Sequence, residues 1–383
     1  MNITRRGLML GACSVAAHPM LSQVTFAAAP GDARLVVIIL RGAMDGLDVA
    51  RPVGDPLYSK YRPKLAGDGI DLNGYFAMHP KLGDLEYLWR KGQLGFAHAV
   101  STPYRDERSH FDGQDLLEAG TGMGNGAARG GWLNRMVAAI PKAEVNLAFG
   151  VGSDPLPVIT GARRVARWSP DVDVDLTPQA ELLLRHIYAP DPVFATAADE
   201  GMALAATIEK SALPKLANGK RRDPVAAFTA ERLRAETRIA AFSLSGWDTH
   251  QGQAKGINAA LDKLSRSLLT LHEGLGAVWD KTLVLAVTEF GRTVAENGTA
   301  GTDHGTAGAM IMAGGALRGG TVMGTWPGLE ESALYKRRDL MPTEDVRRYA
   351  AWGMHDLFGI SSSTLERDVF PGLGMGTTPQ LIL

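Results

Sequence analysis

The chain has 383 residues, with 40 lysines and arginines against 41 aspartates and glutamates, a formal net charge of −1 and 45% hydrophobic residues. This length and apolar content suffice for one large domain with its own core. No block of basic residues is interleaved with aromatic residues, so the composition argues against a nucleic-acid partner.

The first residues have the pattern of an export signal. Residues 4–10 (TRRGLML) place paired arginines before an apolar stretch, and residues 26–29 (FAAA) offer small residues for cleavage. We therefore expect a twin-arginine-type signal peptide at 1–29 and a periplasmic or secreted protein; an ordinary secretory signal, or lipid attachment at Cys13, are the alternatives. Cys13 is the only cysteine, so the exported protein would have no disulfide. No later apolar stretch is long enough to cross a membrane.

Apolar runs of strand length alternate with helical patterns along the rest of the chain. Strands are expected at 35–40, 94–100, 238–244 and 282–287, and leucines three and four residues apart predict a helix over 255–280. Such alternation is typical of an α/β fold with a mainly parallel central sheet flanked by helices. A further helix should begin near Thr343. We expect a single domain over 30–383, with an irregular helical insertion at about 154–224.

Carboxylates and histidines recur where the expected strands end. In an open parallel sheet, residues after the carboxyl ends of the strands meet at one edge. Mixed carboxylate and imidazole ligands suit zinc, manganese or iron better than calcium. A single aspartate in such a place is more often a helix cap than a ligand. The candidate ligands are Asp45, Asp48, Asp248, His250, Glu289, Asp303 and His304.

Ser109 and His110 precede a probable helix in the segment YRDERSHFDGQDLLEAG. A serine at a helix N-terminus can act as a nucleophile, because free backbone N–H groups and the helix dipole stabilise an anion there. The alternative is that Ser109 only caps the helix, with His110 in a surface contact.

With these residues in view, the chain resembles the secreted sulfatase-like family known as domain of unknown function 1501, within the alkaline phosphatase superfamily. The resemblance covers nearly the whole mature chain. The motifs that carry it are LRGAMDGLD, TPYRDERSHFDGQDLLEAG, GGWLNR, SGWDTHQ, TEFGRT and GTDHGTAGAMIMAGG.

The superfamily implies two metal sites at a sheet edge. Asp248, His250 and His304 match the first, although the superfamily usually has three residues rather than one between the first two. Asp45, Glu289 and the nucleophile Ser109 match parts of the second. Phe290 stands where that site has its histidine, so the second site is incomplete unless Asp303 or His110 completes it.

The resemblance also leaves the anion-binding residue and the nucleophile open. Arg292 or Arg41 could hold the anion that a second metal would otherwise hold. Ser101 matches the letters of a sulfatase formylglycine motif, but Ser109 has the better distance to Gly120.

The sequence thus predicts an exported hydrolase that uses one or two divalent ions, zinc or manganese. Its substrate would be a phosphate or sulfate ester, either a small molecule or linked to a polymer. Ser109, His110 and Arg292 would be the catalytic residues. The alternative is a non-catalytic secreted binding or assembly protein with a degenerate site, and protein partners are not predicted.

Overall fold

The computed structural model describes residues 32–123, 130–140, 147–163, 165–168, 182–183, 186–187 and 215–383. The signal peptide expected at 1–29 and Cys13 lie outside the described residues, as does much of the insertion expected at 154–224.

A mixed, mainly parallel sheet forms the centre of the protein. Within the described residues it has nine strands in the order β11-β5-β10-β9-β1-β8-β6-β7, with β12 also pairing with β5. Strands β9, β1, β8, β6 and β7 are parallel, whereas β10 runs antiparallel to both of its neighbours. The strands of this main sheet are β1 (Arg34–Arg41), β5 (Leu94–Ser101), β6 (Ala148–Val151), β7 (Ala166–Trp168), β8 (Ile239–Ser245), β9 (Thr282–Val287), β10 (Gly308–Ala313), β11 (Val322–Met323) and β12 (Glu344–Asp345).

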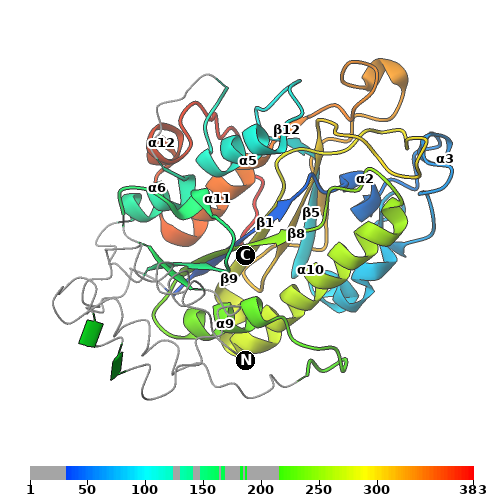
Figure 1. The fold of residues 1–383 in the computed structure, drawn as a ribbon. Coiled ribbons are helices and arrows are strands. Elements are labelled where there is room, and N and C mark those ends of the chain that lie inside the picture. The colour runs from blue at the N-terminus through cyan, green and yellow to red at the C-terminus, as the bar shows by residue number, and fades with distance from the viewer. Residues whose placement is uncertain are drawn as a thin grey trace.

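Helices cover both faces of this sheet (Figure 1). Alternate residues of β1 point to opposite faces, as the two-residue period of a strand requires. Ile38 packs in the core under α9 and α10, and Ile39 packs in the core under α6 and α11. The main helices are α4 (Glu86–Arg90), α5 (His110–Ala119), α6 (Trp132–Ala139), α9 (Pro224–Arg234), α10 (Gln253–Leu275) and α11 (Val346–Phe358). The short ones are α2 (Gly46–Val49), α3 (Tyr58–Tyr61) and α12 (Ser362–Thr364).

A smaller three-stranded sheet, in the order β2-β4-β3, lies beside the main one. Its strands are β2 (Ala50–Arg51), β3 (Ile70–Asp71) and β4 (Ala77–Met78).

The α/β architecture predicted from the sequence is confirmed, and the differences are local. The helix expected near Thr343 begins at Val346, because Glu344 and Asp345 pair with β5 and Asp345 then caps the helix. The antiparallel strand β10 was not predicted, since its apolar run GAMIMA carries no period that distinguishes strand from helix. In the segment where an insertion was expected, Ala166–Trp168 joins the main sheet as β7.

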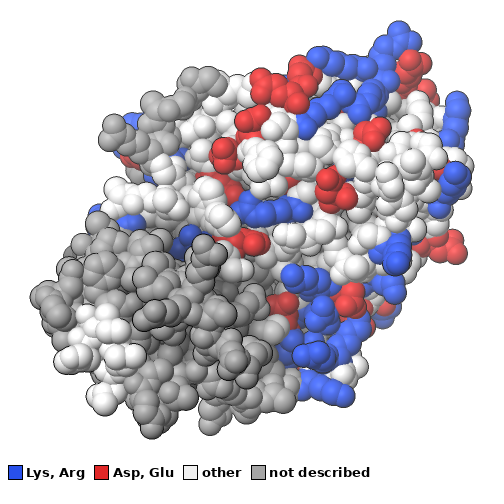
Figure 2. Space-filling model, in the orientation of Figure 1, with Lys and Arg blue, Asp and Glu red and all other residues white. Residues whose placement is uncertain are grey.

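On the face of the protein seen in Figure 2, the described charged side chains are of both signs and intermixed, as the near-neutral composition leads one to expect. None of the helices in the described part of the chain combines the length and apolar content needed to span a membrane.

Two buried histidines make stability depend on pH. Burial lowers the pKa of His79 and of His98 from 6.5 to about 4 in each case. The unfolded chain therefore binds more protons than the folded protein between these values, so stability is complete above pH 6.5 and falls as the pH drops towards 4.

We expect the free energy of unfolding to fall by a few kcal/mol over that range, because one pKa unit corresponds to about 1.4 kcal/mol. Urea unfolding at several pH values measures it. His98→Gln should flatten the dependence, since Gln does not titrate; an equally steep dependence in that variant would contradict the assignment to His98.

Candidate functional site

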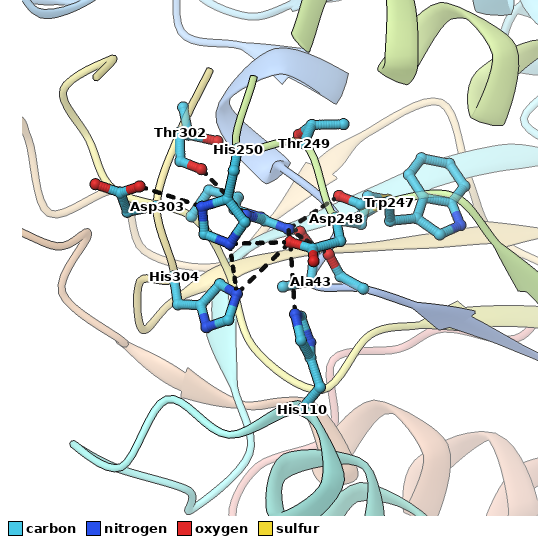
Figure 3. A network of polar contacts seen from close by, with 12 residues as sticks. Ala43, His110, Trp247, Asp248, Thr249, His250, Thr302, Asp303 and His304 are labelled. Atoms are coloured by element: carbon cyan, nitrogen blue, oxygen red, sulfur yellow. Dashed lines mark hydrogen bonds and ion pairs between the residues drawn. The ribbon is translucent and has the colours of Figure 1, made fainter. Parts of the chain in front are cut away.

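Three histidines and an aspartate meet beyond the carboxyl ends of the central strands (Figure 3). Asp248 and His250 lie in the loop between β8 and α10, and His304 lies in the segment between β9 and β10. His110 is the first residue of α5. Residues far apart in the sequence therefore come together at one sheet edge.

The three imidazole rings direct Nε2 at the same carboxylate oxygen. The distance to Asp248 Oδ1 is 3.1 Å from His250, 3.5 Å from His110 and 3.6 Å from His304. The Nε2 atoms of His250 and His304 are 2.9 Å apart. These four residues form what we call the histidine cluster.

Each ring is held from behind through Nδ1. His110 Nδ1 lies 2.8 Å from Glu289 Oε1 and His250 Nδ1 lies 3.2 Å from Asp303 Oδ1. His304 Nδ1 lies 2.7 Å from the backbone oxygen of Arg108. Ionised carboxylates and carbonyls only accept hydrogen bonds, so each Nδ1 carries the proton. The Nε2 lone pairs of the neutral rings then face one another and Asp248.

That arrangement requires a cation. His110 Nε2 is buried and has no hydrogen-bond partner, although its ring approaches Asp248. The hydrogen bond to Glu289 raises the pKa of His110, whereas burial lowers the pKa of His304. Either a proton shared within the cluster or a metal ion would relieve the repulsion between the converging lone pairs.

The residues fit a metal ion. Four ligands at zinc–nitrogen and zinc–oxygen bond lengths lie roughly 3.3 Å from one another in a tetrahedron. The distances from the three Nε2 atoms to Asp248 Oδ1, and the distance between the Nε2 atoms of His250 and His304, range from 2.9 to 3.6 Å and bracket that value. Ligating histidines usually donate their second N–H to a carboxylate or a backbone carbonyl, the arrangement found at all three rings here. The ligand atoms of His110, Asp248 and His304 all lie within 4.8 Å of one another, and His250 Nε2 lies 2.9 Å from His304 Nε2.

Glu289 and Asp303, predicted as ligands, lie behind histidines. Glu289 is fully buried, and its Oε1 accepts hydrogen bonds from the backbone N of Gly42 and from Gln114 besides its contact with His110. Burial alone would raise the pKa of Glu289, but the hydrogen bonds, chiefly that with His110, hold it below its usual value. In this geometry Glu289 orients His110.

Arg292, predicted to hold the anion, faces the protein instead. It is 1% exposed, and its Nη2 donates to Asp248 Oδ1 at 2.6 Å. Its other hydrogen bonds go to backbone carbonyls, those of Gly42, Ala43, Trp247 and Thr302. Burial would raise the pKa of Asp248, yet the bond from Arg292 keeps it low. Arg292 therefore fixes the ionised carboxylate from inside the protein.

Phe290 packs against the cluster. Its ring stacks on His110 with centroids 5.3 Å apart and on Tyr104 at 5.7 Å, and it lies 5.2 Å from His304. A side chain at position 113 would meet this ring, since a Cβ on Gly113 would lie 2.9 Å from it. Phe290 thus packs against the imidazole rings of both His110 and His304.

Asp45 and Asp48, also predicted as ligands, are not part of the cluster. Asp45 caps α2 and forms a buried ion pair with Arg62, with 2.5 Å between Nη1 and Oδ2. Asp48 pairs with Arg51 at 2.7 Å. Both aspartates are 1% exposed, and the paired arginines balance their buried charges.

The remaining polar candidates have identifiable partners. Ser109 caps α5 and accepts from the backbone N of Asp112 at 3.4 Å, a weak bond that leaves the half-buried hydroxyl lightly engaged. Ser101 is 5% exposed and donates to the carbonyl of Thr102, which makes it unsuited to attack. Arg41 is held by Glu118 and Gln114 rather than by the cluster.

Reasoning from the sequence missed Gln253 and Asn297. Asn297 Nδ2 donates to His250 O at 2.9 Å and to Asp303 Oδ1 at 3.1 Å, so it joins the loops that carry the two residues. Neither amide lies at a strand end or in a metal-ligand spacing, and no sequence signal would have identified it.

An α/β protein with a histidine and aspartate cluster at its sheet edge is therefore the class that fold and site define. The chain matches the family described as "Protein of unknown function (DUF1501)" over residues 77–347 and belongs to that family, which confirms the resemblance found in the sequence. No curated protein matches the chain.

The chain is also similar to solved structures. A mutant of TAB5 alkaline phosphatase with Mg bound is 10% identical, with a TM-score of 0.34, covering 75% of this chain and 92% of that one. The lipoteichoic acid synthase LtaP from Listeria monocytogenes is 9% identical, with a TM-score of 0.39, covering 92% and 78%. A protein in the alkaline phosphatase superfamily from Vibrio parahaemolyticus is 11% identical, with a TM-score of 0.33, covering 80% and 69%.

The buried position of Asp45 leads to a prediction. Asp45→Asn should lower the free energy of unfolding by about 3–5 kcal/mol, because it leaves the charge of Arg62 buried and unpaired. Chemical denaturation measures this, and the folded variant should still take up metal when the ion is supplied in excess, because Asp45 lies outside the cluster. Asp368→Asn, which breaks the exposed ion pair with Arg367, is the matched control and should cost less than about 1 kcal/mol. Unchanged stability with loss of bound metal would identify Asp45 as a ligand after all.

Proposed function

We propose that the histidine cluster binds one divalent metal ion, zinc or manganese, and that the protein is an exported hydrolase of phosphate or sulfate esters. The observation that carries the metal site is the convergence of three Nε2 atoms on Asp248 Oδ1, each ring having its Nδ1 held by an acceptor. Such oriented imidazoles are the usual form of a metal centre. The step from metal site to hydrolase rests on the position of the cluster at the sheet edge and on the family resemblance.

The chain's own residues have separable roles in this proposal. A bound divalent ion would polarise an ester oxygen and lower the pKa of a nearby hydroxyl. Glu289, Asp303 and the carbonyl of Arg108 fix the three rings, and Arg292 fixes Asp248. Ser109 is the proposed nucleophile, because it adjoins His110 at the N-terminus of a ten-residue helix, where backbone N–H groups favour an anion. The substrate would be a small or polymer-linked anionic ester.

The alternative is a secreted binding or assembly protein that keeps the metal centre without turnover. Two observations favour it. Phe290 occupies the space beside His110 and His304 with an apolar ring, and Asp45 is engaged by Arg62. The residues matched to a second metal site therefore do not meet at the cluster.

Removal of His250 tests the metal centre. We expect His250→Ala to lose bound metal and any ester hydrolysis, because one of the converging nitrogens is gone. Elemental analysis of protein purified without chelator, together with a screen of phosphate and sulfate esters, measures both. His272→Ala is the control, since His272 contacts Tyr87 away from the site. Full metal content in His250→Ala would contradict the assignment, and metal without turnover in the wild type would favour the binding protein.

Ser109 has two possible roles, and two variants separate them. Ser109→Asn removes the nucleophilic hydroxyl but keeps a residue that caps helices as well as serine does, whereas Ser109→Ala removes both and should cost about 1 kcal/mol. If Ser109 is the nucleophile, both variants lose turnover, and only Ser109→Ala also loses stability. Turnover that survives in Ser109→Asn would show that the serine serves only as a cap.

A further inference from the structure

We propose that Gln253 is a positioning residue that fixes the two metal-binding loops relative to each other. The inference rests on the metal centre proposed above. Gln253 is the first residue of α10 and is completely buried. Its Oε1 accepts hydrogen bonds from Thr249 Oγ1 at 3.0 Å and from Thr302 Oγ1 at 2.6 Å. One side-chain oxygen thus joins two segments more than fifty positions apart.

Those two threonines adjoin the residues of the cluster. Thr249 lies between Asp248 and His250, and Thr302 lies two residues before His304. The loops also touch directly, because the backbone N of Thr302 donates to Thr249 O at 3.2 Å. A Cβ on Gly301 would lie 2.2 Å from His250 O, so only glycine permits this approach. The spacing between the ligand-bearing loops therefore depends on contacts at their base.

The amide group of Gln253 has a single possible orientation. Its Nε2 donates to Asp45 Oδ2 at 2.6 Å and to Asp48 Oδ2 at 3.1 Å. Carboxylates accept but do not donate, so the NH2 must face them and the oxygen must face the threonines. Arg62 and Arg51 in turn hold these carboxylates. Both N–H groups and both acceptor positions of the amide are used, and no rotation of the side chain preserves them.

This arrangement also explains why carboxylates recur beside the cluster without binding in it. Asp45 and Asp48 form the fixed base against which Gln253 is oriented, and Gln253 transmits that position to both loops. Other residues that hold metal ligands from behind change metal affinity about 10–100-fold when they are replaced. An amide at the base of two ligand loops should have an effect in that range.

The test compares three variants of the full chain, with zinc as the probe. Gln253→Ala removes the whole contact, and Thr302→Val removes one hydroxyl while keeping the shape of the side chain. Thr270→Val, on the same helix, removes a buried hydroxyl that accepts from the backbone N of Asp223, far from the loops in sequence, and serves as the control. Two quantities are measured: the zinc dissociation constant, and hydrogen exchange at the Thr302 amide in metal-free protein.

We expect Gln253→Ala to weaken zinc binding about tenfold or more and to speed exchange at the Thr302 amide. Thr302→Val should move both in the same direction by less, and Thr270→Val should change neither even if it lowers stability. The proposal would be overturned if Gln253→Ala and Thr302→Val both bind zinc within about twofold of the wild-type affinity and the amide of residue 302 exchanges as slowly as in the wild type. If Gln253→Ala does not fold, Thr302→Val decides. If wild-type protein binds no zinc, the proposed function fails, whereas amide exchange still decides the role of Gln253.

Discussion

The guanidinium of Arg292 is the interaction on which the arrangement of the site depends. It lies between the loop after β1, the loop after β8 and the segment that leads to His304, and it donates to backbone carbonyls in all three. Its remaining strong bond holds Asp248. A planar group with five donors in a rigid fork can serve several acceptors at once, which a lysine could not do. The position of the carboxylate at the centre of the cluster is therefore set by backbone from three loops.

The sequence predicted which residues gather at the sheet edge, because the ends of buried strands can be recognised from their apolar runs. The apolar runs 238–244 and 282–287 correspond to β8 and β9 in the structure, and the residues that follow them lie together at one edge of the sheet. Asp248, His250 and His304 were placed together on that basis and on the family motifs. His110 was expected just before a helix, either in a surface contact or in the place of the missing histidine of a second site, and in the structure it is the first residue of that helix.

The roles of individual side chains could not be read in the same way. A strand-end pattern does not say which of two neighbouring residues binds an ion and which holds the binder, so Glu289 and Asp303 were indistinguishable from ligands. Asp45 depends on Arg62, which follows a short helix without periodic signal, and no spacing rule links the two. The side-chain amide of Gln253 has partners in three segments, two of them distant in sequence. The role of each such side chain can be assigned only from the three-dimensional structure, because it depends on interatomic distances to within a few tenths of an ångström and on which atoms can donate a hydrogen bond.

Charge balance bears on the choice between an enzyme and a binding protein. With neutral imidazoles, Asp248, Glu289 and Asp303 contribute three negative charges to the site and Arg292 contributes one positive charge. A divalent ion would bring this sum to zero, and a neutral centre has little long-range attraction for an anionic ester. Positive charge for such a substrate must then come from the rim. Two arginines flank His304 there. The backbone oxygen of Arg108, whose side chain is exposed, accepts from the ring of His304, and Arg338 Nη2 donates to the carbonyl oxygen of His304. A hydrolase of anionic esters therefore requires these two side chains to face the bound anion, and a protein that only binds metal does not.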